Sequence, residues 1–359
     1  MSAASAELGL LCSGVGSDPL LVQGGGGNGS IKDDGELWIK ASGYRMSEVS
    51  ASSGFTRVGL DSMLGLIRDS RWEGMERKAA QEEFVRQTNL LASGARPSME
   101  TGFHALLGRA ALHTHSVVMN AFACCASGES LLGSLGGDIV WIPYETPGLE
   151  LARAIEARFG SSVGSIRAGV LEQHGFFSVG SSALEALDVT RSCLSLARAV
   201  LGDLPSDALT RISPSADVVA WAEGLAAASG LAARACSFAP ILRCPDLFAG
   251  GALIPDDAIY TELEVHVGSV SEAPGDWFSS RVAAGARRCV ALLSGAGVVV
   301  AGPEKSLSAM EESLLAHALV RELVGRVGAV TNLPEAESRY LLSLDSEAYR
   351  QRVAAGDAG

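Results

Sequence analysis

Three features are scarce in this chain: clustered positive charge, long apolar runs and paired cysteines. Its 28 Lys and Arg residues are outnumbered by 41 Asp and Glu residues, which gives a formal net charge of -13 at pH 7. Binding to phosphates needs clustered Lys and Arg, and no such run stands out in the sequence. We therefore expect no nucleic-acid partner and no membrane partner.

The sequence also has no segment that approaches the roughly 20 apolar residues of a membrane-spanning helix. The mild apolar run from Leu8 to Cys12 follows no positively charged segment, unlike a secretory signal. The seven cysteines are odd in number and form no Cys-x-x-Cys pair. Together these absences predict buried thiols, no disulfides and a cytoplasmic location.

What the chain does have is enough apolar sequence for a large core. It is 359 residues long, with 47% hydrophobic and 19% charged residues, which is compatible with two domains. The segment from Gly202 to Pro205 is rich in turn residues and follows a long expected helix, so it is the best boundary. We predict one domain at residues 1–205 and a second at residues 206–359.

Apolar periodicity predicts an α/β fold for the first domain. Strands are expected at 30–32, 36–40, 110–113, 139–142, 168–172 and 176–179. The first two flank an Asp33-Asp34-Gly35 turn and form a hairpin. Helices are expected at 60–67, 78–91, 149–159 and 183–201. A further helix is expected to start at Pro97-Ser98 and to carry Glu100 and His104 on one face.

Histidine is scarce as well, with only six in the chain. His113 and His115 are one residue apart at an expected strand end, so their imidazoles point to the same side and can bind one metal ion. His174, beside a glycine between two expected strands, completes a set of three. The other three histidines have no predicted ligand role: His104, His266 and His317.

Residues after about 206 repeat part of this order. Leu292 to Gly302, followed by Ser306 to Val324, gives the same strand, glycine turn, strand, glycine and helix as residues 171–200. This alignment puts Gly297 opposite Gly175, but Ala296 opposite His174. The second domain is therefore either a degenerate partial copy without a metal site or a coincidental α/β pattern.

A glycine-rich segment from Gly24 to Ser30 can expose consecutive backbone N–H groups to an anion, helped by the hydroxyls of Ser30, Ser42 and Ser98. A hairpin rather than a long helix follows it, which argues against dinucleotide binding. Four basic residues lie nearby in the sequence and are expected mainly at the solvated surface: Lys32, Lys40, Arg45 and Arg96.

Six short motifs connect these observations. They are Gly-Gly-Asn-Gly-Ser at 26–30, Lys-Ala-Ser-Gly at 40–43, Pro-Ser-Met-Glu-Thr at 97–101, His-Thr-His-Ser at 113–116, Ile-Pro-Tyr at 142–144 and Gln-His-Gly at 173–175. In this order they resemble the class II aldolase/adducin family, from about Asp18 to Leu201. Its metal enzymes include fuculose phosphate and rhamnulose phosphate aldolases and ribulose phosphate 4-epimerase. The resemblance implies a central antiparallel sheet flanked by helices, and a homo-tetramer with sites between subunits.

The resemblance also implies roles for individual residues. His113, His115 and His174 would bind Zn²⁺ or another divalent metal, and Glu100 would be a further ligand and the acid/base. The residues implied at the phosphate end of the substrate pocket are Gly27, Asn28, Ser42, Gly43 and Ser98. Tyr144 resembles a tyrosine that acts on the reacting oxygen of a neighbouring subunit's substrate.

Met99 departs from the pattern of the family, because phosphate-binding members often have a second serine or a similar polar residue at its position. This departure favours weaker binding of phosphate or a substrate with another tail. The expected partner is nevertheless a small sugar-phosphate-like molecule.

We therefore expect a zinc-dependent aldolase, a lyase of carbohydrate metabolism that cleaves or forms a C–C bond in a ketose or hydroxy-keto compound. A divalent ion held by neutral imidazoles can stabilise the enediolate of aldol cleavage without a Schiff-base lysine. Pentulose-phosphate 4-epimerisation and 3-oxo acid phosphate decarboxylation are alternatives on the same site, although the epimerases tend to have aspartate where this chain has Glu100. The alternative of another class is a non-catalytic adducin-like binding module, against which the complete ligand set speaks.

Overall fold

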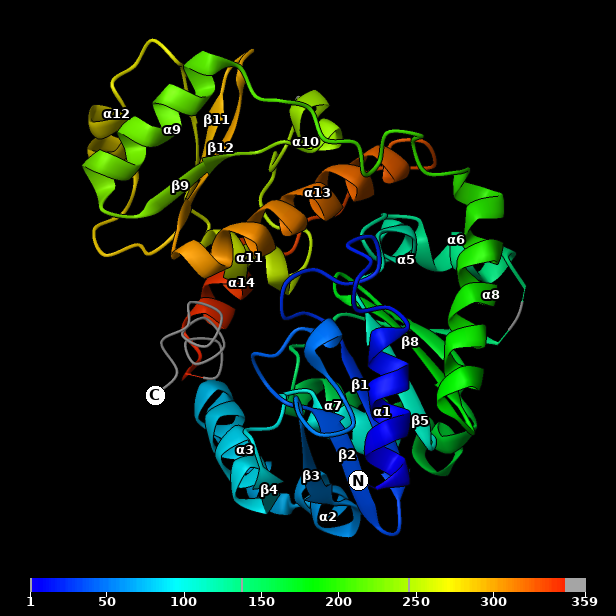
Figure 1. The fold of residues 1–359 in the computed structure, drawn as a ribbon. Coiled ribbons are helices and arrows are strands. Elements are labelled where there is room, and N and C mark those ends of the chain that lie inside the picture. The colour runs from blue at the N-terminus through cyan, green and yellow to red at the C-terminus, as the bar shows by residue number, and fades with distance from the viewer. Residues whose placement is uncertain (1, 137, 245, 346–359) are drawn as a thin grey trace.

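The computed structural model describes residues 2–136, 138–244 and 246–345. These residues form an eight-stranded sheet and a four-stranded sheet, each covered by helices (Figure 1). The end of the predicted second domain, residues 346–359, lies outside the described residues. None of the described helices is both long enough and apolar enough to cross a membrane.

The larger sheet has the strand order β4-β3-β2-β1-β5-β8-β7-β6. All neighbouring pairs in it are antiparallel except β6 and β7, which are parallel at one edge. The expected α/β class with a central sheet is thus confirmed, with a parallel edge pair added. The strands are β1 (Asn28–Asp33), β2 (Glu36–Lys40), β3 (Phe55–Gly59), β4 (Ala92–Gly94), β5 (Ala110–Thr114), β6 (Ile139–Ile142), β7 (Ala168–Leu171) and β8 (Gly175–Gly180).

The predicted hairpin is the element that positions the glycine-rich segment. Asp34 and Gly35 both have positive φ, 47° and 74°, as a two-residue turn of type I′ requires. The hairpin places β1 beside β5, where Asn28 is paired with His113. The glycine-rich segment therefore enters the sheet next to the expected metal ligands.

The helices of the first part pack on both faces of this sheet. Those at 149–159 and 183–201 have the predicted bounds. The helix expected from Pro97-Ser98 begins later, because residues 98–101 form a turn in which the Thr101 N–H donates to the Ser98 carbonyl at 3.2 Å. The helices are α1 (Ala3–Ser13), α2 (Leu60–Arg68), α3 (Arg77–Leu91), α4 (Thr101–Leu106), α5 (Val117–Ala123), α6 (Gly128–Ser134), α7 (Leu149–Phe159) and α8 (Ala183–Leu201).

The smaller sheet has the order β10-β11-β12-β9, again with one parallel edge pair, β10 and β11. Its elements are α9 (Ala216–Ser229), β9 (Ala232–Ala235), α10 (Ala239–Arg243), α11 (Pro255–Thr261), β10 (Val265–Gly268), α12 (Pro274–Arg281), β11 (Cys289–Leu293), β12 (Gly297–Gly302), α13 (Leu307–Val324) and α14 (Glu335–Leu342). Short 3-10 helices lie at Met46–Glu48, Ser70–Trp72, Gly160–Ser165 and Glu304–Ser306.

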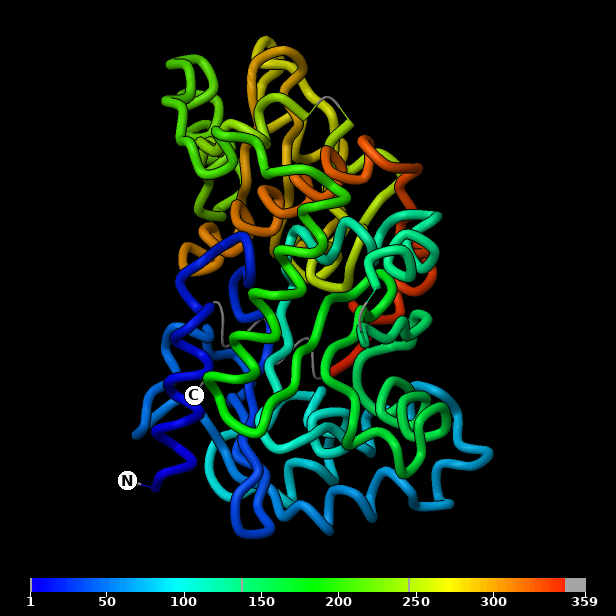
Figure 2. The backbone as a smooth tube through the Cα atoms, turned by 90° about the vertical axis from the view of Figure 1, so that its right-hand side faces the viewer, coloured from blue at the N-terminus to red at the C-terminus, as the bar shows by residue number. Residues whose placement is uncertain are grey.

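One hydrophobic core joins the two sheets. It contains Phe122 of α5, Ala197 of α8 and Leu319 of α13, each essentially inaccessible to solvent. Figure 2, turned by 90°, shows the second part stacked on one end of the first, with α13 between them. The second part therefore packs against the first beside the end of the central strand β5, where the expected site lies.

Candidate metal centre

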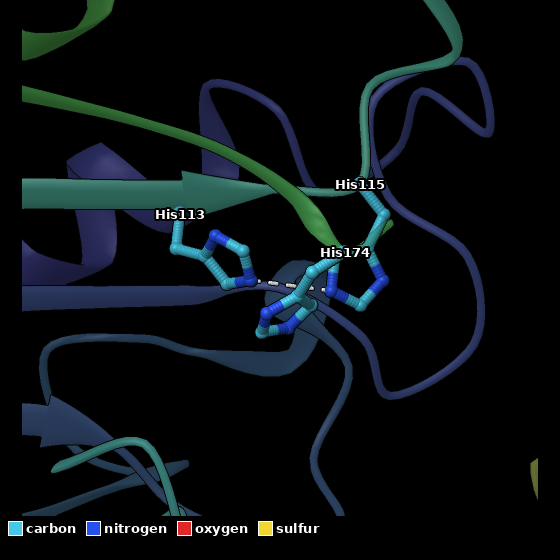
Figure 3. A group of neighbouring side chains, drawn as sticks. All are labelled: His113, His115 and His174. Carbon is cyan, nitrogen blue, oxygen red and sulfur yellow. Dashed lines mark hydrogen bonds between the residues drawn. The ribbon is translucent and has the colours of Figure 1, made fainter. Parts of the chain in front are cut away.

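The three predicted histidines converge at the end of β5 and the β7–β8 turn. His113 is the fourth residue of β5, and His115 directly follows the strand. His174 lies in the three-residue turn between Leu171 and Gly175, which are paired across the hairpin. Figure 3 shows the three imidazoles turned toward one another, and all three residues are buried.

The spacing of their nitrogens fits one metal ion. The Nε2 atoms of His113 and His115 are 3.2 Å apart, and one ligand atom from each histidine lies within 4.8 Å of the others. Two nitrogens at tetrahedral positions about 2.0–2.1 Å from zinc would lie about 3.3 Å from each other. The buried triad is compatible with a divalent metal site.

Glu100 adds a carboxylate to the cluster. Its Oε1 atom lies 3.0 Å from His174 Nε2 and 3.5 Å from His113 Nε2. This oxygen is buried and makes no hydrogen bond within the described part of the chain. An unsatisfied buried carboxylate oxygen is costly without a cation, so its position also fits a metal.

Hydrogen bonds of the Nδ1 atoms explain how two of the three histidine rings are oriented. His113 Nδ1 donates to the carbonyl of Phe176 at 3.0 Å, and His115 Nδ1 donates to Asp256 Oδ2 at 2.9 Å. Both acceptors lack a proton to give, so Nδ1 carries the hydrogen and Nε2 keeps its lone pair for a metal. His174 Nδ1 has no hydrogen-bond partner among the described residues.

Burial and charge set the protonation states that such a site needs. Burial holds the pKa of the His113 imidazole well below its usual range, which favours the neutral, ligating form. Burial alone would raise the pKa of the Glu100 carboxyl, but the imidazoles of His113 and His174 hold that pKa well below its usual range. Glu100 is thus ionised beside the histidines.

Asn28 and Ser98 hold the other side of Glu100. The Asn28 amide donates from Nδ2 to Glu100 Oε2 at 2.5 Å and to Ser98 Oγ at 2.9 Å. The Ser98 hydroxyl in turn accepts from the Glu100 backbone N–H at 3.2 Å. Two residues expected at the substrate's phosphate end therefore also fix the carboxylate.

A pocket opens beside this cluster and brings the predicted residues together. Glu100, His115 and His174 contribute to its wall. All five residues expected at the phosphate end line it: Gly27, Asn28, Ser42, Gly43 and Ser98. Lys40, Arg96 and Met99 line the same pocket, so two basic residues and one apolar residue contribute to its wall.

The expectation of a solvated surface is wrong for the two lysines. Lys40 is only 2% exposed, and its ammonium donates to the Gly25 and Tyr44 carbonyls at 3.1 and 2.8 Å. Lys32 donates to the carbonyls of Ala105 and Leu107, and burial lowers its pKa to about 8. Each lysine comes directly after a buried residue of its strand. Its long aliphatic stem can extend along apolar surface while the ammonium group reaches a polar partner.

Arg45 and Arg96 are also engaged with other groups. Arg45 pairs with Glu312 of α13 at 2.9 Å, and Arg96 borders the pocket. Of the four nearby basic residues, Lys40 and Arg96 thus line the pocket, and Lys32 and Arg45 do not.

The first three backbone N–H groups of the glycine-rich segment already have hydrogen-bond partners within the protein. The N–H of Gly24 donates to Glu312 Oε2 at 2.8 Å, and the N–H of Gly25 donates to the Tyr260 hydroxyl at 2.7 Å. The N–H of Gly26 donates to the Gln23 carbonyl at 2.9 Å. The prediction of consecutive amides exposed to an anion is therefore wrong for these three residues, because the second part of the chain occupies two of them.

Tyr144 lies apart from the histidines. Its hydroxyl donates to Glu337 Oε1 at 3.1 Å, and its side chain packs against a buried cluster to which Leu341 of α14 belongs. It is not among the residues that line the pocket, and burial raises its pKa above the ordinary phenol range. The structure does not bring Tyr144 to the metal centre of its own chain, and its action on a neighbouring subunit's substrate stays a prediction.

The remaining histidines have partners of their own. His104 is buried against Ser30, with Nδ1 and Oγ 2.8 Å apart, and burial lowers its pKa to about 4. His266 pairs with Glu264 and His317 with Asp257, each at 2.9 Å. Each of these two histidines thus contacts a carboxylate, and neither belongs to the triad.

Three residues from the second part escaped the sequence analysis: Asp256, Tyr260 and Glu312. Asp256 follows Pro255 at a helix start, where an acidic residue is favoured by the helix dipole alone. Nothing in the local sequence marks it as a neighbour of His115, because that contact joins residues distant along the chain.

Comparison with known proteins places this geometry in a family. The model of the Class II Aldolase and Adducin N-terminal domain matches residues 15–201, and the chain belongs to that family. The uncharacterized oxidoreductase YuxG of Bacillus subtilis is 25% identical over 200 residues, which cover 53% of this chain and 28% of that protein. The match thus spans well under half of the length of this relative.

Solved structures with related folds include three class II aldolase-type proteins. The N-terminal class II aldolase domain of a conserved Thermoplasma acidophilum protein is 25% identical, with a TM-score of 0.48, covering 56% of this chain and 95% of that one. YgbL of Klebsiella pneumoniae, a putative aldolase/epimerase/decarboxylase, is 22% identical, with a TM-score of 0.41 and coverages of 57% and 94%. The l-fuculose-1-phosphate aldolase of Thermus thermophilus is 19% identical, with a TM-score of 0.37 and coverages of 56% and 95%.

Proposed function

We propose that the protein is a zinc-dependent or other divalent-metal-dependent lyase. It would cleave or form a C–C bond in a ketose or hydroxy-keto compound by aldol chemistry. The observation that carries the proposal is the meeting of three buried imidazoles with the unsatisfied Oε1 of Glu100. Membership of the class II aldolase and adducin family supports it.

The residues of the site divide the chemistry between them. A bound divalent ion would supply Lewis acidity that stabilises negative charge on the carbonyl oxygen of the substrate. Glu100 would take or return a proton at the carbon next to that carbonyl, because it is ionised and borders the pocket. The Asn28 amide would keep Glu100 Oε2 in place, so that Oε1 remains directed at the imidazoles.

The pocket suits a substrate with an anionic tail. Lys40 and Arg96 provide positive charge, and Ser42 and Ser98 provide hydroxyl donors. A sugar-phosphate-like molecule, as in the name of the Thermus fuculose-1-phosphate aldolase, is the substrate class that we propose. Met99, at the same wall, would contact an apolar part of that molecule.

We further propose that the domains are residues 1–205 and 206–359, and that the second is a degenerate partial copy of the first. The hairpin pair Leu171 and Gly175 corresponds to Leu293 and Gly297. The order β10-β11-β12-β9 repeats β6-β7-β8-β5, with the same parallel edge pair and the same antiparallel neighbours.

The copy would lack a metal site of its own. The pair Ala110 and Gly180 corresponds to Ala232 and Gly302, at the same spacing along the chain. That spacing puts Ala235, Ser237 and Ala296 where the first part has its three histidines. The proposal predicts one metal ion per chain, and a second ion bound at full occupancy would contradict it.

Metal analysis of the purified protein, followed by product analysis, tests the proposed reaction. We expect near-stoichiometric zinc or another divalent ion, and condensation of dihydroxyacetone phosphate with one of a panel of aldehydes. A protein without metal would favour the adducin-like binding module. Formation of only a C4 epimer from a pentulose phosphate, or carbon dioxide from a 3-oxo acid phosphate, would replace the aldolase proposal by epimerisation or decarboxylation.

A further inference from the structure

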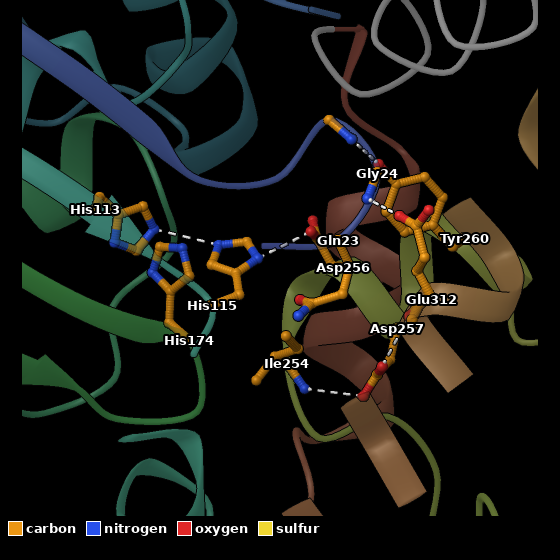
Figure 4. A network of polar contacts seen from close by, with 12 residues as sticks. Gln23, Gly24, His113, His115, His174, Ile254, Asp256, Asp257, Tyr260 and Glu312 are labelled. Atoms are coloured by element: carbon orange, nitrogen blue, oxygen red, sulfur yellow. Dashed lines mark hydrogen bonds and ion pairs between the residues drawn. The ribbon is translucent and has the colours of Figure 1, made fainter. Parts of the chain in front are cut away.

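The outer nitrogen of His115 meets a carboxylate from the other part of the chain. His115 Nδ1 and Asp256 Oδ2 are 2.9 Å apart, and the two residues are only 3% and 2% exposed. Figure 4 shows His115 between His113 on one side and Asp256 on the other. Asp256 thus contacts the Nδ1 atom of the His115 ring, whereas the Nε2 atom faces His113.

The helix that carries Asp256 also contacts the glycine-rich segment. Tyr260, one turn further along α11, accepts a hydrogen bond from the Gly25 N–H at 2.7 Å. A Cβ atom added to Gly26 would lie 2.5 Å from Asp256 Oδ2 and 2.9 Å from His115 Nδ1. The segment therefore packs directly on the Asp256–His115 pair, and no other residue type fits at position 26 without a shift.

The start of α11 is itself fixed on α13. Asp257 Oδ2 accepts from His317 Nδ1 at 2.9 Å and from the Leu253 N–H at 2.9 Å, while its Oδ1 accepts from the Ser313 hydroxyl at 3.1 Å. These residues are buried. The neighbouring Asp256 is therefore held at one place relative to the first part.

We infer that Asp256 is a positioning residue of the metal centre, supplied by the second part of the chain. It holds the proton on His115 Nδ1 and fixes the ring, so that Nε2 is presented to the metal as a stronger donor. The inference rests on the metal site of the proposed function. It gives the second part a role in that site, although the part has no histidine triad of its own.

The inference predicts that Asp256 governs metal affinity. In the full-length metal-free protein, Asp256→Asn should weaken Co²⁺ binding by about 10- to 100-fold, measured by competition with a chelator. The absorption bands of bound Co²⁺ should shift as well, because the geometry of the His115 ligand changes. A matched control is Asp217→Asn, which removes one exposed carboxylate at the start of α9 and should bind Co²⁺ like the wild type.

A purely structural role of Asp256 would give a different result. It would lower the thermal stability of the metal-free protein but leave the affinity and spectrum of Co²⁺ unchanged. Affinity of Asp256→Asn within a few-fold of the wild type would overturn the inference.

A second measurement needs no variant to fold. In the zinc-loaded wild type with ¹⁵N-labelled histidine, we expect His115 to carry its proton on Nδ1 and the metal on Nε2. Metal on Nδ1, or a proton on Nε2, would overturn the inference.

The two proposals fail in different ways. Wild-type protein that binds no divalent ion would overturn both of them. Metal bound equally well by the wild type and Asp256→Asn would overturn only the role of Asp256. Loss of metal affinity in Asp256→Asn, in a protein without lyase activity, would support the role of Asp256 and overturn only the reaction.

Discussion

At the scale of single residues, Glu100 has two oxygens with different surroundings. Oε2 accepts from Asn28 at 2.5 Å, whereas Oε1 faces His174 and His113 without a hydrogen bond among the described residues. Under the proposed function, Oε2 is the oxygen held in place and Oε1 is the one that takes part in proton transfer.

Replacement of Glu100 tests its role in proton transfer. Glu100→Gln keeps the shape of the side chain but removes its basicity, so kcat should fall by about 100-fold or more in the aldol assay. Glu129→Gln, at an exposed position in the first turn of α6, serves as the control and should leave kcat near the wild-type value. A Glu100→Gln enzyme with nearly full kcat would rule out the acid/base role.

Cys12 provides a residue-scale test of burial. Burial raises the pKa of its thiol from 9.0 to about 12. Above pH 9 the unfolded chain loses the thiol proton while the folded chain keeps it, so this group lowers the unfolding free energy as the pH rises. Below pH 9 the thiol is protonated in both states, and its contribution does not change.

The comparison with Cys12→Ala isolates that contribution. The stability gap between wild type and variant should be constant from pH 7 to 8 and should shrink above pH 9, by at most about 1.4 kcal/mol per pH unit. Urea unfolding under reducing conditions at a series of pH values measures the gap. A gap that stays constant to about pH 10 would show that the thiol is not held in its neutral form.

At the scale of elements, the sequence predicted those whose pattern is local. The turn at Asp34 and Gly35 fixed the β1–β2 hairpin, and the long amphipathic patterns fixed α7 and α8. The helix α5 was missed because every one of its residues is buried, so it has no polar face. β4 was missed because it is a three-residue edge strand with hardly any pattern.

Helix α14 has one carboxylate with several partners in the first part of the chain. Glu337 accepts from Arg77, Tyr144 and Thr146 of the first part. Its side chain is only 11% exposed, in contrast to Glu335 on the same helix at 72%.

This contrast provides a matched pair of variants. Glu337→Gln should lower the unfolding free energy by about 1–3 kcal/mol, because the little-exposed carboxylate of Glu337 is a charged acceptor for three side chains, of which Thr146 is itself buried. Glu335→Gln removes only an exposed ion pair with Arg339 and should change the unfolding free energy by less than about 1 kcal/mol. Chemical denaturation of both variants provides the comparison, and equal effects would show that Glu337 does not anchor α14.

At the scale of the whole molecule, both parts share one core and one site. Phe122 and Leu319 belong to the same buried cluster, and Asp256 reaches across to His115. A homo-tetramer and a cytoplasmic location remain predictions from the sequence, and light scattering of the purified protein would check the first.

The shared core predicts one cooperative unfolding transition. Because the metal ligands form only in the folded state, Co²⁺ at about 100 times its Kd should add about 2.7 kcal/mol of stability and shift the whole transition upward. His113→Ala should abolish the shift in calorimetry, as should a chelator added to the wild type. Two transitions of which only one responds to metal would contradict a single unit.

The sequence by itself brought out the three histidines that converge and the five pocket-lining residues expected at the phosphate end. Their motifs are short and local, and spacing along a strand places His113 and His115 on one side. It also determined the hairpin and the long helices, for which local periodicity is enough. The same local information misjudged Lys40, because its burial depends on what packs above its strand.

Only the tertiary structure decided what surrounds that ligand set. Asp256 behind His115, Tyr260 on the Gly25 amide and Glu312 on the Gly24 amide all come from the second part of the chain. These contacts join residues far apart in sequence, and a hydrogen bond between them depends on how helices pack rather than on any local pattern. The candidate metal ligands were thus evident from the sequence, whereas the contacts around them depend on the packing of α11 and α13.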